Sequence, residues 1–179
     1  MNRRGSKTRK VAMLGMMYAL AILLSIVEGW VMPLFGLPPG VKLGLSNIVV
    51  MYTLFFVGWK EAYLLSGLKA LGVFITRGGI GASLSLAGGI ASVTFMLLLL
   101  MLPKKWNLSY FIIAVCGAVM HNMGQIAMCA VLLSSAYAFY YFPVLLVSGI
   151  AMGTITGTTL KYIMPALKNV ITSENGKGW

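Results

Sequence analysis

The chain has 179 residues, of which 59% are hydrophobic and 9% are charged, and its mean hydropathy is +0.90. Soluble domains typically carry ~25% charged residues. This composition therefore indicates an integral membrane protein and leaves no room for a separate soluble domain. The net charge of +11 does not indicate a nucleic-acid partner, because a basic binding patch needs a water-exposed surface. We interpret the lysines and arginines as determinants of membrane topology.

The chain is long enough for about six membrane spans of ~20 residues each. We predict an all-α fold with a six-helix transmembrane domain at 11–165, a basic tail at 1–10 and a polar tail at 166–179. Proline, glycine and charged residues separate the apolar stretches. The predicted helices are 11–28, 44–58, 61–76, 83–102, 108–133 and 143–164. The segments 29–43 and 76–82 are predicted to be loops on the outer side of the membrane.

The distribution of basic residues predicts the orientation of this bundle. An even number of spans places both termini on one side, and eleven of the fourteen lysines and arginines fall on that side. Only Lys42, Lys69 and Arg77 fall on the opposite side or inside the membrane. Because basic residues favour cytoplasmic loops, we predict a multi-pass protein of the plasma membrane with both termini in the cytoplasm.

Polar side chains interrupt two of the apolar stretches. His121 is the only histidine of the chain, with Asn122 beside it and Gln125 four residues on. At 3.6 residues per turn, His121 and Gln125 lie on one helix face. Lys69 falls midway along its own predicted helix, at a similar depth. Such groups near the centre of a bilayer are costly unless they are paired, hydrated or used.

Our hypothesis is that these residues line a cavity that opens outward, between loops 29–43 and 76–82. A cationic and amide-rich lining suits a ligand with a carboxylate, a phosphate or a polar ring. The alternative is an internal hydrogen-bond network that holds the helices together. The candidate ligand-binding residues are Lys42, Asn47, Lys69, Arg77, His121, Asn122 and Gln125, and Glu28 is expected at the outer mouth.

Small residues recur on two predicted helices. Gly149, Gly153 and Gly157 are spaced four apart in the last one, which allows close helix–helix approach, and we expect that packing inside the monomer. In the first helix the small residues are Ala12, Gly15 and Ala19. This stripe allows two interpretations, internal packing or a docking face for another membrane protein.

The acidic residues limit the chemistry that the chain can perform. Only Glu28, Glu61 and Glu174 are acidic, and aspartate is absent. No pair of carboxylates is available for a magnesium ion, and no serine–histidine–acid set lies at one depth. We therefore predict no catalytic residue, no metal site and no cofactor, and we do not expect independent enzyme activity.

Several short motifs together resemble a known family. They are KLGLSN (42–47), GWKEA (58–62), SLAGG (85–89), HNMGQ (121–125), YFPVL (141–145) and Ser148-Gly149. They resemble the family called heptaprenyl diphosphate synthase component I, or Gx transporter family, over about residues 10–165. That family is similar to the substrate-binding S components of energy-coupling factor (ECF) transporters.

The resemblance to S components implies a six-helix bundle with cytoplasmic termini and an outward-facing pocket for a small anionic or vitamin- or flavin-like ligand. It also implies that the stripe on the first helix docks on a transmembrane coupling subunit, which works with ATPases. In this chain Gly15-x-x-x-Ala19 is a variant of the Ala-x-x-x-Ala pattern typical of such stripes.

The synthase name implies a different role. Prenyl diphosphate synthases use aspartate-rich magnesium sites, and this sequence has no aspartate. Under this alternative the chain is a non-catalytic membrane subunit in isoprenoid or quinone biosynthesis, and a soluble synthase subunit supplies the chemistry. A third alternative is a structural membrane subunit of a redox complex, since members of the family are associated with flavin-based extracellular electron transfer.

Overall fold

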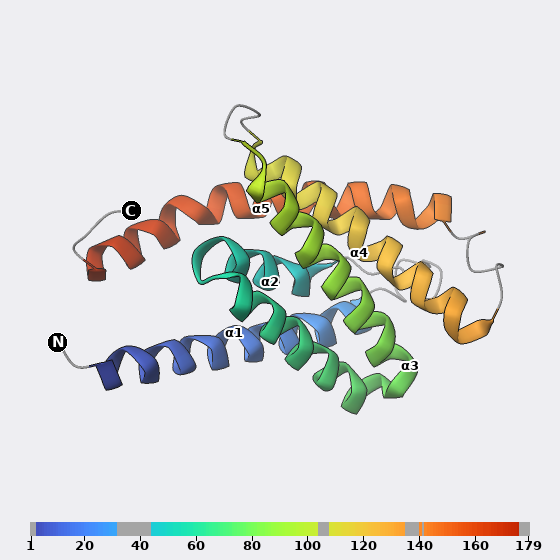
Figure 1. Cartoon of the computed structure of the whole chain (residues 1–179), viewed down its shortest axis with the longest axis horizontal. Coiled ribbons are helices and arrows are strands. Elements are labelled where there is room, and N and C mark those ends of the chain that lie inside the picture. Colours follow the sequence, from blue (N-terminus) through green and yellow to red (C-terminus); the bar gives the residue numbers. More distant parts are fainter. Residues whose placement is uncertain (1–2, 32–43, 104–107, 135–139, 141, 176–179) are drawn as a thin grey trace.

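The computed structural model describes residues 3–31, 44–103, 108–134, 140 and 142–175, with side chains described only in part at 3–10 and not at 163–175. All regular structure in these ranges is helical, which confirms the predicted all-α class. The helices are α1 (Arg3–Val31), α2 (Leu45–Phe56), α3 (Trp59–Met101), α4 (Tyr110–Leu133) and α5 (Phe142–Asn175) (Figure 1).

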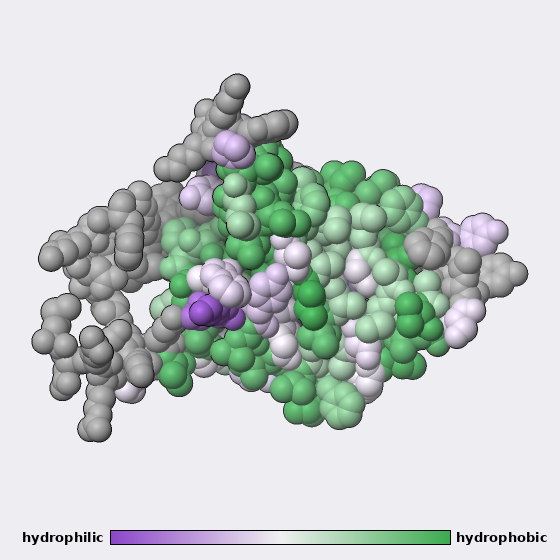
Figure 2. All heavy atoms as spheres, in the orientation of Figure 1, coloured by the Kyte–Doolittle hydropathy of each residue, from purple (hydrophilic) through white to green (hydrophobic). Residues whose placement is uncertain are grey.

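Four of these helices, α1, α3, α4 and α5, are long and apolar enough to cross a membrane. The helix α2 is apolar but shorter. Large hydrophobic side chains cover much of the surface, and Figure 2 shows them over most of the visible face. Such a surface is stable in contact with lipid and would be an aggregation hazard in water.

The helix α3 differs from the prediction of two helices joined by a loop at 76–82. The chain stays helical through this segment except at Gly78, whose φ is 73° and ψ is −174°. A positive φ is accessible to glycine at low cost, so a single residue redirects the helix without unwinding its neighbours. Two arms, 59–77 and 79–101, meet there at a sharp angle (Figure 1). The prediction of a loop at 76–82 was therefore wrong.

Both ends of the chain are more helical than predicted. The helix α1 includes most of the basic tail, because it begins at Arg3 and ends at Val31 rather than at residue 28. The helix α5 passes the expected end at Pro165 and continues to Asn175. Extending an existing helix costs far less than nucleating one, and lysine and arginine are good helix formers. The start of α1 and the end of α5 lie on the same side of the molecule (Figure 1).

The helix α2 forms the centre of the bundle and packs against α1, α3 and α5. Its Met51 is fully buried, and it joins a core with Leu65 and Met96 of α3 and Leu160 of α5. The most extensive contacts are those of α4 with α3 and with α5. This arrangement brings the first half of α2 and the middle of α4 to the same region, beside α3.

Candidate functional site

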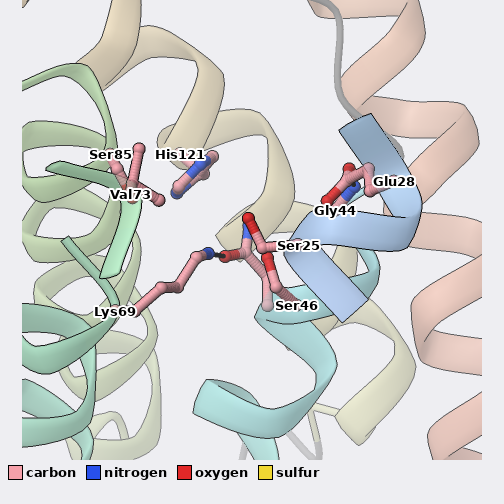
Figure 3. A pocket seen from close by; sticks show the side chains of 9 residues that line it. Ser25, Glu28, Gly44, Ser46, Lys69, Val73, Ser85 and His121 are labelled. Carbon is pink, nitrogen blue, oxygen red and sulfur yellow. Dashed lines mark hydrogen bonds between the residues drawn. The ribbon is translucent and has the colours of Figure 1, made fainter. Parts of the chain in front are cut away.

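A small polar cavity lies where α1, α2, α3 and α4 meet (Figure 3). Its volume is about 10 Å³, which is room for about one water molecule. Charged and hydroxyl side chains dominate its lining, although the surrounding bundle is apolar. The lining residues are Ser25, Glu28, Gly44, Ser46, Asn47, Lys69, Val73, Ser85 and His121.

Lys69 and Asn47 form one wall of this cavity. Lys69 lies in the first arm of α3 with 6% of its surface exposed, and Asn47 lies in the first turn of α2 with 8% exposed. The ammonium Nζ of Lys69 donates a hydrogen bond of 2.7 Å to Oδ1 of Asn47. A buried ammonium carries a large desolvation cost that hydrogen bonds and an opposite charge must offset.

Glu28 is a buried carboxylate in the lining of the same cavity. This residue of α1 is 2% exposed, and its Oε1 accepts a hydrogen bond from the backbone N–H of Gly44. Gly44 precedes the first turn of α2 in a left-handed conformation with φ of 75°. A carboxylate is favourable at this position, because the N-terminus of a helix carries partial positive charge.

We had placed Glu28 at the mouth of the cavity and had not counted it among the ligand-binding residues. The structure places it in the lining, so a carboxylate and an ammonium border the same space. We expected a cationic lining, but the lining contains side chains of both charges. The sequence did contain a signal for this residue, because Glu28 is one acid in an otherwise apolar stretch and such residues are costly in a membrane.

His121 contributes the α4 side of the lining and is 4% exposed. It reaches the cavity because α4 approaches α3 closely at Gly88. A Cβ atom on Gly88 would lie 2.8 Å from the carbonyl oxygen of His121 and 2.9 Å from Cγ of Gln125. Among the described residues, no group of three histidine, cysteine, aspartate or glutamate side chains is placed to hold a metal ion. The lining offers hydrogen-bond donors and acceptors for binding.

The predicted polar motif of α4 divides between three environments. The side chains of His121 and Gln125 both lie against Gly88, but His121 also borders the cavity, whereas Gln125, 7% exposed, is not part of the lining. Asn122 points to α5, where its Nδ2 donates hydrogen bonds of 2.8 Å to the carbonyl oxygen of Leu145 and 3.4 Å to Oγ of Ser148. The structure therefore does not bring Asn122 and Gln125 into the cavity that Lys69 borders.

The remaining two candidates lie elsewhere. Arg77 is exposed at the end of the first arm of α3, next to the kink. Its Nη2 donates a hydrogen bond of 3.1 Å to the carbonyl oxygen of Ser25 in α1, and its guanidinium lies against Gly29. Arg77 is thus outside the lining, but it joins α3 to α1 beside the cavity. Lys42 lies outside the described residues.

The glycines of α5 face α4. A Cβ atom on Gly149 would lie 3.2 Å from Cα of Val119, and one on Gly153 only 2.6 Å from Cα of Val115. A Cβ atom on Gly157 would lie 3.3 Å from Cα of Phe111, which also belongs to α4. These glycines let the two backbones approach without a side chain between them.

The stripe on α1 has the opposite character. Ala12, Gly15 and Ala19 are all exposed, and nothing lies within 4 Å of the position of a Cβ on Gly15. The neighbouring Val11 and Met16 are 69% and 68% exposed. This face of α1 is therefore available to lipid or to a membrane partner.

A second, larger hollow lies on the outside of α3, between its two arms. Its volume is about 590 Å³, and its lining is almost entirely apolar. Leu64, Leu71 and Phe74 contribute from the first arm and Leu86 from the second. Gly67 also belongs to the lining, and a Cβ there would meet nothing within 4 Å. We call this hollow the α3 groove.

Comparison with known proteins gives one match. The family model for heptaprenyl diphosphate synthase component I matches residues 17–163, a range that includes every described residue of the polar cavity. No curated protein and no solved structure matches the chain. The matched range covers most of the 179 residues and includes the motifs that carried the resemblance seen in the sequence. The chain therefore belongs to the heptaprenyl diphosphate synthase component I family.

Proposed function

We propose that this protein is a membrane-embedded substrate-binding protein of the ECF S-component type, which holds a small polar ligand in the cavity between α1, α2, α3 and α4. The observation that carries the proposal is the pair of buried charges, Lys69 and Glu28, on the border of one cavity. Taking a charged side chain out of water costs several kcal/mol even when it is hydrogen-bonded. A bundle that needs only to pack therefore has little reason to keep both charges.

The chemistry of the lining narrows the class of ligand. Lys69 offers a strong hydrogen-bond donor, and Glu28 a strong acceptor. A carbonyl or carboxylate oxygen of the ligand would face Lys69, and an N–H or O–H group would face Glu28. A polar ring with both kinds of group on its edge, as in vitamin- or flavin-like compounds, fits this lining better than a simple anion, which Glu28 would repel.

The cavity is much smaller than a typical ligand pocket. Pockets for drug-sized ligands measure roughly 300–1,000 Å³, whereas this one holds about 10 Å³. We interpret this arrangement as a closed form of the site. Binding would then require a movement of the walls. Among the helices that form these walls, α1 is the least tightly packed, with its main contacts on α2 and α3.

The proposal includes a topology and partners. At 1.5 Å per residue, each arm of α3 is long enough to cross most of the ~30 Å apolar layer. Counted with α1, α2, α4 and α5, the two arms make six membrane segments, with both termini in the cytoplasm of a plasma-membrane protein. Transport would require a coupling subunit, docked on Ala12, Gly15 and Ala19, and its ATPases.

Identification of a bound compound tests the proposal directly. The protein would be purified from its native membrane, and small molecules released from it would be identified by mass spectrometry. We expect a polar ring compound in the wild type and at least a tenfold loss of it in Lys69→Met. Lys60→Met serves as the control, because Lys60 is an exposed cation on the same helix. Equal retention in Lys69→Met, with higher thermal stability, would show that the polar layer serves packing.

A second candidate function is a non-catalytic membrane subunit of heptaprenyl diphosphate synthase, acting with a soluble synthase subunit. Family membership favours it, and so does the α3 groove, whose size and apolar lining suit a prenyl chain. In this role the protein would hold the hydrophobic product at the membrane while the soluble partner makes it. Loss of prenyl product when the α3 groove is filled would support this candidate.

A further inference from the structure

The wall that separates the cavity from the outside of the bundle on the α1 side consists of the last turns of that helix. Two of their residues, Ser25 and Glu28, belong to the lining. The next residues lead to Trp30, which is 77% exposed. This segment, 25–31, is therefore thin: one of its faces borders the cavity and another borders the surroundings of the protein.

In the part of the chain that the structure describes, polar contacts of Glu28 and of Arg77 join this segment to its neighbours. On the inner face, the carboxylate of Glu28 accepts the backbone N–H of Gly44 at the start of α2. On the outer face, the guanidinium of Arg77 reaches across Gly29 to the carbonyl oxygen of Ser25. Figure 3 shows Glu28 and Gly44 side by side on the far side of the cavity from Lys69.

The two contacts differ in what they join. Glu28 ties α1 to α2, and Arg77 ties α1 to α3 at the residue before the Gly78 kink. The contact of Arg77 lies at the surface, where water competes for both partners, so it is weaker than the buried one. The contact of Arg77 also lies beside the Gly78 kink, where the two arms of α3 meet.

We propose that residues 25–31 are the gate of the polar cavity, and that Glu28 and Arg77 are the two residues that hold this gate shut. Release of both contacts lets the end of α1 swing away from α2 and from the α3 kink. The cavity then becomes open to a ligand beside Ser25. The role of the gate in admitting a ligand rests on the proposed binding function, but the closure itself does not.

Cysteine accessibility tests the gate without knowledge of the ligand. Ser85 borders the cavity from the second arm of α3, away from both contacts, and is 2% exposed. The reporter is Ser85→Cys in a background in which Cys116 and Cys129 are changed to alanine. The probe is a charged, membrane-impermeant methanethiosulfonate reagent, applied to the purified protein. We expect slow labelling while the gate is intact.

Two gate variants and two matched controls complete the design. Glu28→Leu is expected to raise the labelling rate about tenfold, as loss of one charged hydrogen bond predicts. Glu28→Gln, which keeps an acceptor, should fall between it and the parent. Arg77→Gln should raise the rate severalfold, and Arg77→Lys less. Glu61→Leu and Lys60→Gln remove the same charges at the far end of α3 and should leave the rate unchanged.

The outcomes separate the gate from the binding function. Arg77 is exposed, so Arg77→Gln keeps the test valid if Glu28→Leu does not fold. Unchanged labelling in the gate variants, fast labelling in the parent, or equal acceleration in the controls would each overturn the gate. Faster labelling in the gate variants, in a protein that carries no bound compound, would support the gate and count against the proposed binding function.

Discussion

The contact between α4 and α5 and the polar cavity use polar residues of the membrane interior in opposite ways. Between α4 and α5, glycines let the backbones approach, and Asn122 donates hydrogen bonds to the carbonyl oxygen of Leu145 and to Ser148. At the cavity, Lys69 and Glu28 are long, charged and arranged around a space. The difference teaches that an intramembrane polar residue bonded to a neighbouring helix can also border a space, as Lys69 does, whereas Asn122 joins two helices.

The largest effect is expected from Gly153→Val. Its Cβ would lie 2.6 Å from Cα of Val115 and 3.1 Å from Cβ of Ala118. Because the nearest atom belongs to the backbone, α5 must move away from α4, at a cost of ~3 kcal/mol. Thermal unfolding in detergent should show a large loss of stability. Gly15→Val is the matched control, since nothing lies within 4 Å of its Cβ. Equal stability of the two variants would contradict the role of Gly153.

An intermediate effect is expected from Asn122→Leu. The change removes hydrogen bonds between α4 and α5, and such bonds inside membranes contribute ~1 kcal/mol. We expect a modest loss of thermal stability with the bound compound retained. Lys69→Met should lose the compound, because it removes the ammonium that borders the cavity. If Asn122→Leu loses the compound as completely as Lys69→Met, the distinction between the two regions is wrong.

The smallest effect on stability, and the sharpest on function, is expected from Gly67→Leu and Gly15→Leu. Both glycines have open space beside them, and leucine is the better helix former, so both variants should fold. Gly15→Leu should lower the recovery of a co-expressed coupling subunit severalfold, because it roughens the stripe on α1, whereas Gly67→Leu should not. The measurement is co-purification from detergent-solubilised membranes.

The reverse pattern would favour the second candidate function. Gly67→Leu fills the α3 groove, so it would then lower the prenyl product formed by membranes with the soluble synthase subunit, and Gly15→Leu would leave that product unchanged. The same two variants therefore discriminate between a transport role and a synthase-subunit role, and each serves as the control of the other.

Several structural features were accessible from the sequence. Hydropathy predicted the helical membrane class, because the lipid-facing preference of each residue adds along the chain. The burial of Lys69 was predictable from its position midway along an apolar stretch. The break between the predicted helices 44–58 and 61–76 was also predictable, and Gly58 adopts φ of 146° between α2 and α3. These features depend on composition and on local sequence.

Other features required the packed structure. Three glycines at 78, 79 and 81 indicated a loop, yet only Gly78 leaves the helical conformation. A glycine can serve as a kink or remain in a helix, and the neighbouring turns decide which. The last predicted helix was expected to end near Pro165, but α5 continues to Asn175. A proline in an established helix can be tolerated at the cost of a hydrogen bond.

The sequence by itself determined that this protein is an apolar helical bundle with a few polar groups in its interior. Only the tertiary structure decided which of those groups meet. Spacing along α4 placed His121 and Gln125 on one face, and both side chains lie against Gly88 of α3, but only the position of His121 relative to α2 and α3 also brings it to the lining of the cavity. Glu28 borders the same cavity as Lys69 because of the way the helices pack. The surroundings of a side chain depend on the neighbouring helices, whereas hydropathy depends on the residue alone.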